Sequence, residues 1–595
     1  MTREECILFY EKRVTTFRAS LAQQKKNINL ISNLRLLTAI AFLGALYFGF
    51  STTYFFYGAF VLLILFVVLV QRHAKFYAEK VHTENLLNIN IAEGRALTGD
   101  IASFAPGIEF IDGHHPYSHD LDIFGEGSLF QAINRCNTLD GKKQMAHRLS
   151  TPLASAEDIA AHQQAVRELA GNTNFRQHFQ AAGNEIDEQP RDRTELLEWL
   201  RQPSFLFDKS FFGPLLIIVP AITVGAILGA FFFPVLKTIA IVLSLSQWAF
   251  LGLYIKRVNV FHDYISRKKN ILEKYAHLLH YLQPEKFDSP LLQNLSAQAK
   301  DADVKVKALA GLVSSLNARL NAMTNLLVNS TLLYDLQFVY RLEKWKADNA
   351  SNLKMWLDVI CETEMLCSMG TFAFNHPSFT YPEIHTQLAI QTERMGHPLI
   401  PESECVPNSV ALGQGPSVLI ITGANMAGKS TFLRTIGVNL VLALSGGPVC
   451  ATTFRCPVIG LRSGMRTADS LKDHQSYFYA ELNRLKTIMD ELRSDKPLFI
   501  LLDEILKGTN STDKQAGSIA LVKQLIPHPC LALIATHDLA LGELETEYPR
   551  HVKNFCFEAT IENDQLSFDY KLKPGLAQKM NATFLMKKMG IIPKD

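Results

Sequence analysis

The sequence is poor in charge. Asp, Glu, Lys and Arg make up only 19% of its 595 residues, whereas 48% are hydrophobic and 38 are Phe; about 25% charge is usual for globular proteins. So apolar a composition argues against an intrinsically disordered chain. It also indicates that apolar residues are concentrated in particular segments, because a soluble surface of this size needs charge. The net charge of +2 identifies no partner.

Cysteine motifs are also missing. The nine cysteines are scattered, and no two are spaced as Cys-x-x-Cys. The spacing therefore indicates neither a zinc ribbon nor a disulfide scaffold. Reduced thiols in a cytosolic setting agree better with this usage.

Charge is absent from two long stretches. Residues 36–70 contain no charged residue and break at Ser51-Thr52-Thr53; residues 211–255 contain only Lys237 and break near Pro234. Each break leaves two apolar runs near or above the lower limit of about 17 residues for a bilayer span. We therefore expect four spans in two transmembrane helical hairpins. The alternative is a pair of buried core helices, but core helices rarely run so long without charge.

Basic residues flank both predicted hairpins, while the turns inside them carry almost no charge. The positive-inside rule places such flanks, both termini and the soluble segments on the cytoplasmic side of the membrane. We therefore expect a multi-pass protein of a bacterial-type plasma membrane. The spans lack Asp, Glu and Arg, which pumps and channels keep within the membrane, so the hairpins are expected to be anchors. The flanking residues are Lys12, Arg13, Arg18, Lys25, Lys26, Arg35, Arg72, Lys75, Lys80, Lys256, Arg257, Arg267, Lys268 and Lys269.

A G-x4-G-K-S loop follows the apolar run 417–422, which predicts a buried strand. Its glycines let backbone N–H groups surround phosphates, Lys429 reaches the β- and γ-phosphates, and the Ser430 hydroxyl binds Mg²⁺. A helix that starts near Lys429 adds its N-terminal dipole. The predicted nucleotide-binding residues are Gly423, Asn425, Met426, Ala427, Gly428, Lys429, Ser430 and Thr431.

Two further polar groups follow apolar runs. Asp503 and Glu504 come after residues 498–502, and His537 follows residues 531–535. We expect Asp503 to bind Mg²⁺ and Glu504 to polarise the attacking water, with His537 as a γ-phosphate sensor. All three elements would lie at the carboxyl ends of parallel strands, where doubly wound sheets bind ligands. The expected cofactors are ATP and Mg²⁺.

Leu444-Ser-Gly-Gly447 matches the start of the LSGGQ signature of ABC transporters. It lies close behind the phosphate loop, whereas a transporter signature lies shortly before the strand that ends in the Mg²⁺-binding acid, here residues 498–502 before Asp503. Gly446-Gly447-Pro448 is therefore expected to end the helix that begins at Lys429.

The motifs together resemble the MutS family of ABC-type ATPases. The resemblance rests on the Asn-Met pair of the phosphate loop, on Asp503-Glu504 with residues 507–511, and on Ala535-Thr536-His537. It implies a homodimer with two composite ATP sites, in which Ser476 of one chain completes the partner's site. Glu504, His537 and Ser476 are then the catalytic residues. Ala424 and Ala427 depart from the family's usual Pro and Gly.

Weaker similarities extend beyond the motifs, at residues 396–399, 120–141, 163–169 and 570–590. The last resembles the family's closing dimer-contact segment. DNA binding is implied only by the resemblance, and mismatch-specific binding is doubtful because membrane segments stand where a mismatch-recognition domain is expected. Basic residues on helical segments could touch DNA phosphates, although a solvated helix face explains them as well; they are Lys305, Lys307, Arg319, Arg341, Lys344 and Lys346.

The predicted fold class is a C-terminal α/β P-loop ABC-type ATPase domain with an all-α MutS-like core and two transmembrane helical hairpins. The alternatives are an ABC-type membrane-complex or transport ATPase and a nucleotide-switched membrane scaffold. The predicted order is a basic amphipathic helix, hairpin, helical core, hairpin, helical lever and ATPase domain, at residues 1–33, 34–72, 73–200, 201–256, 257–380 and 381–595.

Overall fold

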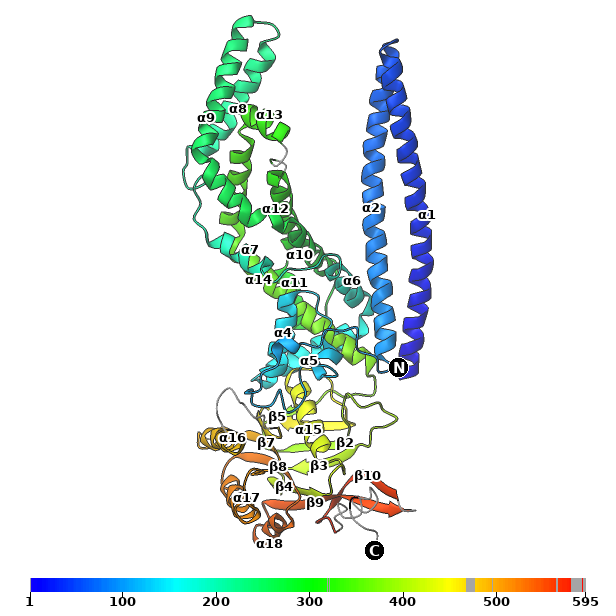
Figure 1. Ribbon diagram of the computed structural model, residues 1–595, viewed down its shortest axis with the longest axis vertical. Coiled ribbons are helices and arrows are strands. Elements are labelled where there is room, and N and C mark those ends of the chain that lie inside the picture. The colour runs from blue at the N-terminus through cyan, green and yellow to red at the C-terminus, as the bar shows by residue number, and fades with distance from the viewer. Residues whose placement is uncertain are drawn as a thin grey trace.

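Two long helical hairpins project away from an α/β domain, as the computed structural model in Figure 1 shows. Hairpin 1 consists of α1 (Arg3–Gly49) and α2 (Tyr54–Ala96), and hairpin 2 of α8 (Phe212–Gly229) and α9 (Pro234–Ile265). The tips of both point to the end of the molecule opposite the α/β domain. The structure describes residues 2–317, 319, 322–466, 477–494, 496–562, 565–578 and 591.

Hairpin 1 begins at the N-terminus with a capped helix. The Thr2 hydroxyl accepts the Glu5 N–H while the Glu5 carboxylate accepts the Thr2 N–H, which satisfies two free donors of the first turn. The helix then continues to Gly49 without a break. The predicted boundary between residues 33 and 34 therefore falls inside one helix, because the amphipathic and apolar halves both favour helix.

Four helices are long and apolar enough to cross a membrane, among the residues that the structure describes. In hairpin 1 only 6% of the most apolar window of each helix is buried inside the protein. These side chains therefore need another apolar environment. The candidate segments are Arg3–Gly49, Tyr54–Ala96, Phe212–Gly229 and Pro234–Leu282.

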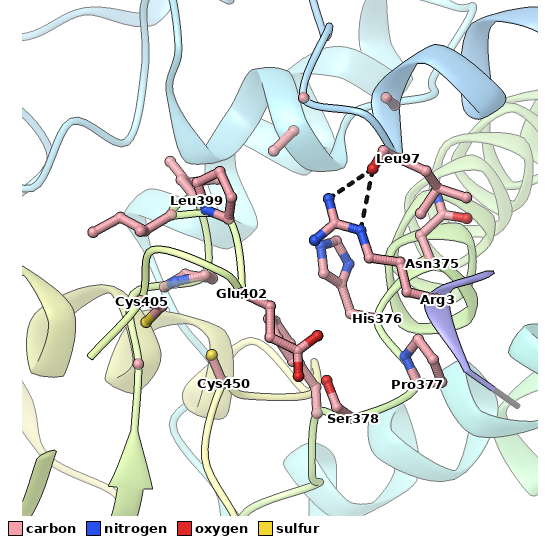
Figure 2. A pocket seen from close by; sticks show the side chains of 18 of the residues that line it. Arg3, Leu97, Asn375, His376, Pro377, Ser378, Leu399, Glu402, Cys405 and Cys450 are labelled. Atoms are coloured by element: carbon pink, nitrogen blue, oxygen red, sulfur yellow. Dashed lines mark hydrogen bonds between the residues drawn. The ribbon is translucent and has the colours of Figure 1, made fainter. Parts of the chain in front are cut away.

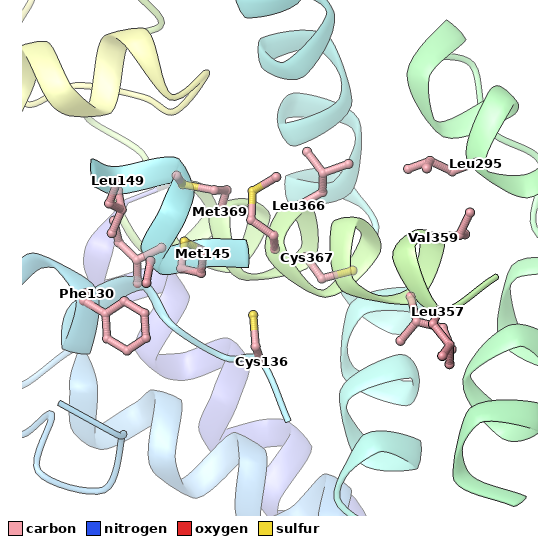
Figure 3. Close-up of a cluster of buried hydrophobic side chains, with 14 of the residues drawn as sticks. Phe130, Cys136, Met145, Leu149, Leu295, Leu357, Val359, Leu366, Cys367 and Met369 are labelled. Atoms are coloured by element: carbon pink, nitrogen blue, oxygen red, sulfur yellow. The ribbon is translucent and has the colours of Figure 1, made fainter. Parts of the chain in front are cut away.

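A helical core joins the hairpins to the α/β domain. Its longest member, α14, runs for about 63 Å at 1.5 Å per residue and packs against α4 and α5. Figure 3 shows Met145 and Leu149 of α4 beside Met369 of α14, with Phe130 of α3 and Leu366 of α14 in the same buried cluster. The core elements are η1 (Ile108–Phe110), α3 (Leu129–Ile133), α4 (Leu139–Ser150), α5 (Ala156–Gly171), α6 (Thr173–Gly183), α7 (Asp192–Arg201), η2 (Ser266–Lys268), α10 (Lys269–Leu282), α11 (Pro290–Gln298), α12 (Ala302–Asn317), α13 (Ala322–Leu332) and α14 (Tyr334–Asn375).

Residues 304–345, in the predicted helical lever, are not one continuous helix. Three helices, α12, α13 and α14, divide this stretch, and Leu333 between the last two adopts a left-handed conformation with φ of 49°. A Leu rarely takes such a conformation without tertiary contacts, and the Leu333 side chain is buried. Periodicity along the chain does not detect such a break.

The α/β domain contains a six-stranded sheet in the order β10-β9-β4-β8-β7-β6, parallel except for β10. Every residue of β4 and β8 is buried, as expected for a sheet covered on both faces. A smaller sheet has the order β1-β5-β2-β3. The elements are β1 (Glu383–His385), β2 (Ile390–Met395), β3 (Asn408–Leu412), β4 (Val418–Gly423), α15 (Lys429–Leu444), β5 (Thr453–Pro457), β6 (Gly460–Gly464), α16 (Tyr477–Leu492), β7 (Leu498–Asp503), α17 (Ser511–Leu525), β8 (Cys530–Thr536), η4 (Leu539–Glu543), α18 (Leu544–Glu547), β9 (Val552–Glu562) and β10 (Gln565–Pro574).

Candidate nucleotide site

The phosphate loop connects β4 to α15 and depends on two glycines. Gly428 precedes α15 with φ of 105°, and a Cβ there would lie 3.2 Å from the Tyr570 ring. A Cβ on Gly423 would lie 2.6 Å from the Phe557 carbonyl oxygen. Both positions therefore require glycine for backbone conformation and for space. The helix ends at Leu444, before the Gly446-Gly447 pair, which confirms that this pair terminates α15.

Lys429 lies under the loop with its ammonium group enclosed. Its Nζ donates to the carbonyl oxygens of Gly423 at 2.8 Å and Ala424 at 3.0 Å, and it lies 3.3 Å from His537 Nε2. Burial lowers the pKa of the Lys429 ammonium because a charged group loses hydration there. A ligand phosphate would compensate this buried charge directly.

Ser430 and Asp503 meet across the strand ends. The Ser430 hydroxyl donates to Asp503 Oδ2 at 2.5 Å. The other carboxylate oxygen of Asp503, Oδ1, is buried and has no hydrogen-bond partner among the described residues. A hydroxyl beside an unsatisfied carboxylate oxygen is a ligand set that suits Mg²⁺. The two residues therefore fit the predicted metal ligands.

Glu504 follows Asp503 and faces His537 from the neighbouring strand. Its Oε1 lies 2.8 Å from His537 Nε2, and its Oε2 lies 3.3 Å from Lys507 Nζ. The hydrogen bond with His537 is the main cause that lowers the pKa of Glu504 to about 2. Glu504 is therefore a carboxylate at neutral pH, as a group that accepts a proton from water must be.

A cavity of about 540 Å³ opens above these residues. Asn425, Met426, Lys429 and Glu504 are among the residues around it. Gly428, Ser430 and Thr431 also line it, whereas Ala427 is buried beneath the loop. The assignment of these residues to a nucleotide stays a prediction, as does the catalytic role of His537.

Two aromatic residues line this cavity that were not predicted from the sequence as site residues. Tyr570 and Phe557 both line it, from β10 and β9. The backbone of Tyr570 has a positive φ of 52° at an irregularity in the strand pair, and its carbonyl accepts a hydrogen bond from Asn408 at 3.0 Å. These features place an aromatic ring against the phosphate loop. The only signal in the sequence was an aromatic residue in the segment that resembles the family's closing region.

The predicted signature residue Ser476 lies outside the described residues. So do residues 579–590 of the predicted dimer-contact segment. Helix α16, which begins at Tyr477, is described. The Glu481 carboxylate accepts the Leu506 N–H at 2.5 Å. This contact connects α16 to the segment that follows Glu504.

Asp120 connects the helical core to the α/β domain, a role that sequence reasoning did not assign. Its buried carboxylate accepts the Ser463 hydroxyl at 2.7 Å, the Met465 N–H at 3.1 Å and Arg484 Nη2 at 2.8 Å. Because Arg484 belongs to α16, this charged pair connects that helix to the helical core. Removing one partner of such a pair is costly.

A second cavity, of about 690 Å³, lies behind the nucleotide cavity at the base of hairpin 1 (Figure 2). The loop around Leu399 and Cys405 lines both cavities. On the opposite wall the Arg3 guanidinium donates to the Leu97 carbonyl oxygen at 2.7 Å. One loop therefore separates the base of hairpin 1 from the nucleotide cavity.

Two of the basic residues considered for DNA contacts are buried. Arg319 pairs with Asp335 at 2.9 Å, and Lys346 donates to the Gln202 carbonyl oxygen at 2.8 Å. Neither side chain is available to a phosphate on the surface. The helical charge pattern could not distinguish these from solvated residues.

Comparison with known proteins identifies two MutS domains. MutS domain III matches residues 116–204 and MutS domain V matches residues 419–594. The DNA mismatch repair protein MutS of Myxococcus xanthus is 25% identical over 537 residues, which cover 79% of this chain and 56% of that protein. MutS of Aquifex pyrophilus is 32% identical over 224 residues, 37% of this chain and 26% of the relative.

These alignments leave much of each relative unmatched. The chain covers 26% of MutS from Natronomonas pharaonis, at 30% identity over 223 residues, and just over half of the Myxococcus protein. Domain V contains the phosphate loop, Asp503-Glu504 and His537, and domain III contains Asp120. The order of the two domains along the chain agrees with the resemblance of the motifs, and the chain contains two domains of the MutS family.

Proposed function

We propose that the protein is a membrane-anchored, MutS-like ATPase that binds and hydrolyses ATP at composite sites in a homodimer. The observation that supports this most directly is the convergence of Lys429, the Ser430–Asp503 pair and the Glu504–His537 pair at one edge of the sheet. Each group has the chemistry that one step of phosphoryl transfer to water requires.

Each of these residues has a separate role in ATP hydrolysis. Lys429 exchanges its loop carbonyl partners for the β- and γ-phosphate oxygens. Ser430 and Asp503 hold Mg²⁺, which when bound neutralises phosphate charge. Glu504 orients a water molecule for attack and accepts its proton, while His537 contacts the γ-phosphate. The partner's copy of the segment containing Ser476 completes the site.

Replacement of Glu504 by Gln tests the hydrolytic role. The variant keeps the size of the side chain but replaces one acceptor oxygen by a donor and cannot take a proton, so we expect ATP binding with hydrolysis lowered about 100-fold or more. Lys429→Ala is expected to lose ATP binding itself. Glu547→Gln removes an exposed carboxylate of α18 that pairs with Lys523 and serves as the control. Normal turnover by Glu504→Gln would refute the assignment.

The same variant tests the dimer. Because ATP completes the contact between two sites, Glu504→Gln with ATP is expected to accumulate as a dimer by light scattering in detergent. Without nucleotide the dimer fraction should fall. A monomeric mass both with and without ATP would refute the composite sites.

We propose that hairpins 1 and 2 cross the bacterial-type plasma membrane, with both termini and the ATPase domain cytoplasmic. Three observations support this: the apolar windows of hairpin 1 are uncovered, both tips point the same way, and basic residues flank the bases. The protein should remain in membranes washed with alkaline carbonate. Release by that wash would refute the anchoring.

DNA is a further candidate ligand, because the relatives are named DNA mismatch repair proteins. Mismatch-specific binding has no support in the described residues. A filter-retention assay with intact and mismatched duplexes tests both points. Phosphate contacts predict retention that falls steeply with salt; equal retention of both duplexes would indicate backbone binding alone, and no retention would refute a DNA role.

A further inference from the structure

Helix α13 lies beside the apolar part of hairpin 2, where the ends of α12 and α14 meet (Figure 1). The Trp248 indole N–H of α9 donates to the Leu326 carbonyl oxygen of α13 at 3.3 Å. The Gln337 side chain, at the start of α14, donates to the Leu216 carbonyl oxygen of α8 at 2.9 Å. Both hairpin residues belong to the stretch 211–255 that contains Lys237 as its only charged residue.

The contact with Trp248 indicates where α13 lies relative to the expected membrane boundary. Lys256 is the first basic residue after the second span of hairpin 2. Trp248 precedes it by about two helical turns, or about 12 Å towards the tip. If Lys256 marks the cytoplasmic boundary of the membrane, α13 lies on the membrane side of that boundary.

The side chains of α13 suit an apolar environment. The helix contains no charged residue. Among its described side chains, Asn329 bonds to Asn325 at 2.7 Å, and the hydroxyls of Ser330 and Thr331 donate to the Leu327 carbonyl oxygen at 2.9 Å. Polar groups satisfied within the helix are the form in which they are tolerated in lipid.

The exposed large side chains of α13 are apolar, among those that the structure describes. Leu326 is 55% exposed and Leu327 is 59% exposed, and they are adjacent on α13. The two charges at the flanks of this helix neutralise each other: Arg319 and Asp335 are both buried and pair at 2.9 Å. Arg319 also donates to the Asn259 side chain of α9 at 2.9 Å. Paired charges of this kind are typical of protein segments in contact with a bilayer.

We propose that α13 is embedded in the cytoplasmic leaflet as a lipid-contacting element beyond the four spans, with Leu326 and Leu327 against acyl chains. This inference rests on the proposed anchoring through the hairpins and goes beyond it, because it places the far end of the helical core itself in lipid. A movement of α14 is then transmitted to the bilayer by α13 as well as by hairpin 2.

Quenching by brominated lipid tests this placement. An environment-sensitive nitrobenzoxadiazole dye is attached at Leu327→Cys in the full chain, in a Cys405→Ser, Cys450→Ser background because the other native cysteines are buried. The labelled protein is reconstituted in phosphatidylcholine–phosphatidylglycerol vesicles with or without bromine on the acyl chains. Val61→Cys, 63% exposed on hairpin 1, and Val304→Cys, 66% exposed on α12, are the matched controls.

We expect brominated lipid to lower the emission at position 327 at least twofold, at position 61 by a similar factor, and at position 304 not at all. Quenching at 61 without quenching at 327 overturns the inference and leaves the anchoring intact. The absence of quenching at both positions refutes the anchoring as well. A blue-shifted dye at 327 that bromine does not quench indicates a protein cover, such as a second copy, and also overturns the inference.

A second labelling position tests whether a local folding defect explains the result at position 327. Leu326→Cys carries the dye on the neighbouring residue and is expected to be quenched by the same lipid. Retained ATP binding by each labelled variant shows that the chain is folded. Quenching at 327 alone, with 326 unaffected in a folded variant, would contradict a lipid-facing pair.

Discussion

The two hairpins are attached to the protein in different ways. In hairpin 1 the buried apolar contacts with the body lie near its base, where Cys6, Tyr10 and Leu97 form a small cluster with Phe374, and Leu86 forms another. Hairpin 2 shares the main hydrophobic core through Phe212, Leu216, Leu251 and Val258. Hairpin 1 is therefore a rod held at one end, whereas hairpin 2 is continuous with the core. A nucleotide-driven change would pivot the first and carry the second along with α14.

The base of hairpin 1 contains the interaction whose loss should cost the most. Arg135 pairs with Glu93 through two hydrogen bonds, of 2.5 and 3.1 Å, and both side chains are almost fully buried. Arg135→Met leaves the buried Glu93 carboxylate without its counter-charge, which should destabilise the protein by about 3–5 kcal/mol. The thermal unfolding temperature in detergent measures the loss.

Hydrogen exchange locates that loss. Protection should fall at the bases of α1 and α2 and be retained in α8 and α9. The double variant Glu93→Leu, Arg135→Met removes both charges and should recover much of the stability. Equal loss of protection in both hairpins would contradict their separate attachment.

The sequence predicts the grouping of polar residues at one sheet edge better than it predicts the connections between domains. The phosphate loop, Asp503-Glu504 and His537 each follow one strand, so a local pattern is enough to place them at one sheet edge. Asp120 contacts Arg484, far away along the chain, and Tyr570 reaches the phosphate loop through a strand irregularity. No local pattern contains these tertiary contacts, and the same is true of the break at Leu333.

One carboxylate of the core binds the segment that leads into hairpin 2. Glu343 of α14 is fully buried and accepts the backbone N–H groups of Phe205, Leu206 and Phe207 at 2.7–2.9 Å. Glu343→Gln replaces one acceptor oxygen by a donor and removes the charge, so we expect a loss of about 1.5–3 kcal/mol. Exchange protection should fall in residues 205–216 while hairpin 1 is unaffected. Loss of protection at Tyr10 would contradict that prediction.

Tyr10 provides a milder test at the base of hairpin 1. Its hydroxyl donates to Asn375 Oδ1 at 2.8 Å, and Asn375 in turn donates to Glu93. Tyr10→Phe keeps the ring packed against Phe374 and removes only the hydrogen bond, which should cost about 1 kcal/mol. Tyr77→Phe, at an exposed position of α2, is the control. A loss as large as that of Arg135→Met would contradict this estimate and indicate that the Tyr10 hydroxyl, through Asn375, is essential to the Glu93–Arg135 pair.

The smallest effect is expected inside hairpin 2. The Gln247 side chain of α9 donates to the Thr223 hydroxyl of α8 at 2.5 Å, and both are buried. Hydrogen bonds between helices in a membrane contribute about 0.6 kcal/mol on average, and the Gln247 carbonyl oxygen has no partner among the described residues. Gln247→Leu therefore loses one bond but also removes one unsatisfied group, and unfolding in bicelles should change by less than about 0.6 kcal/mol. A double-mutant cycle with Thr223→Val isolates the pair. A coupling of several kcal/mol would mean that α8 and α9 depend on this contact, and hairpin 2 would then need its own internal bond as well as the support of the core.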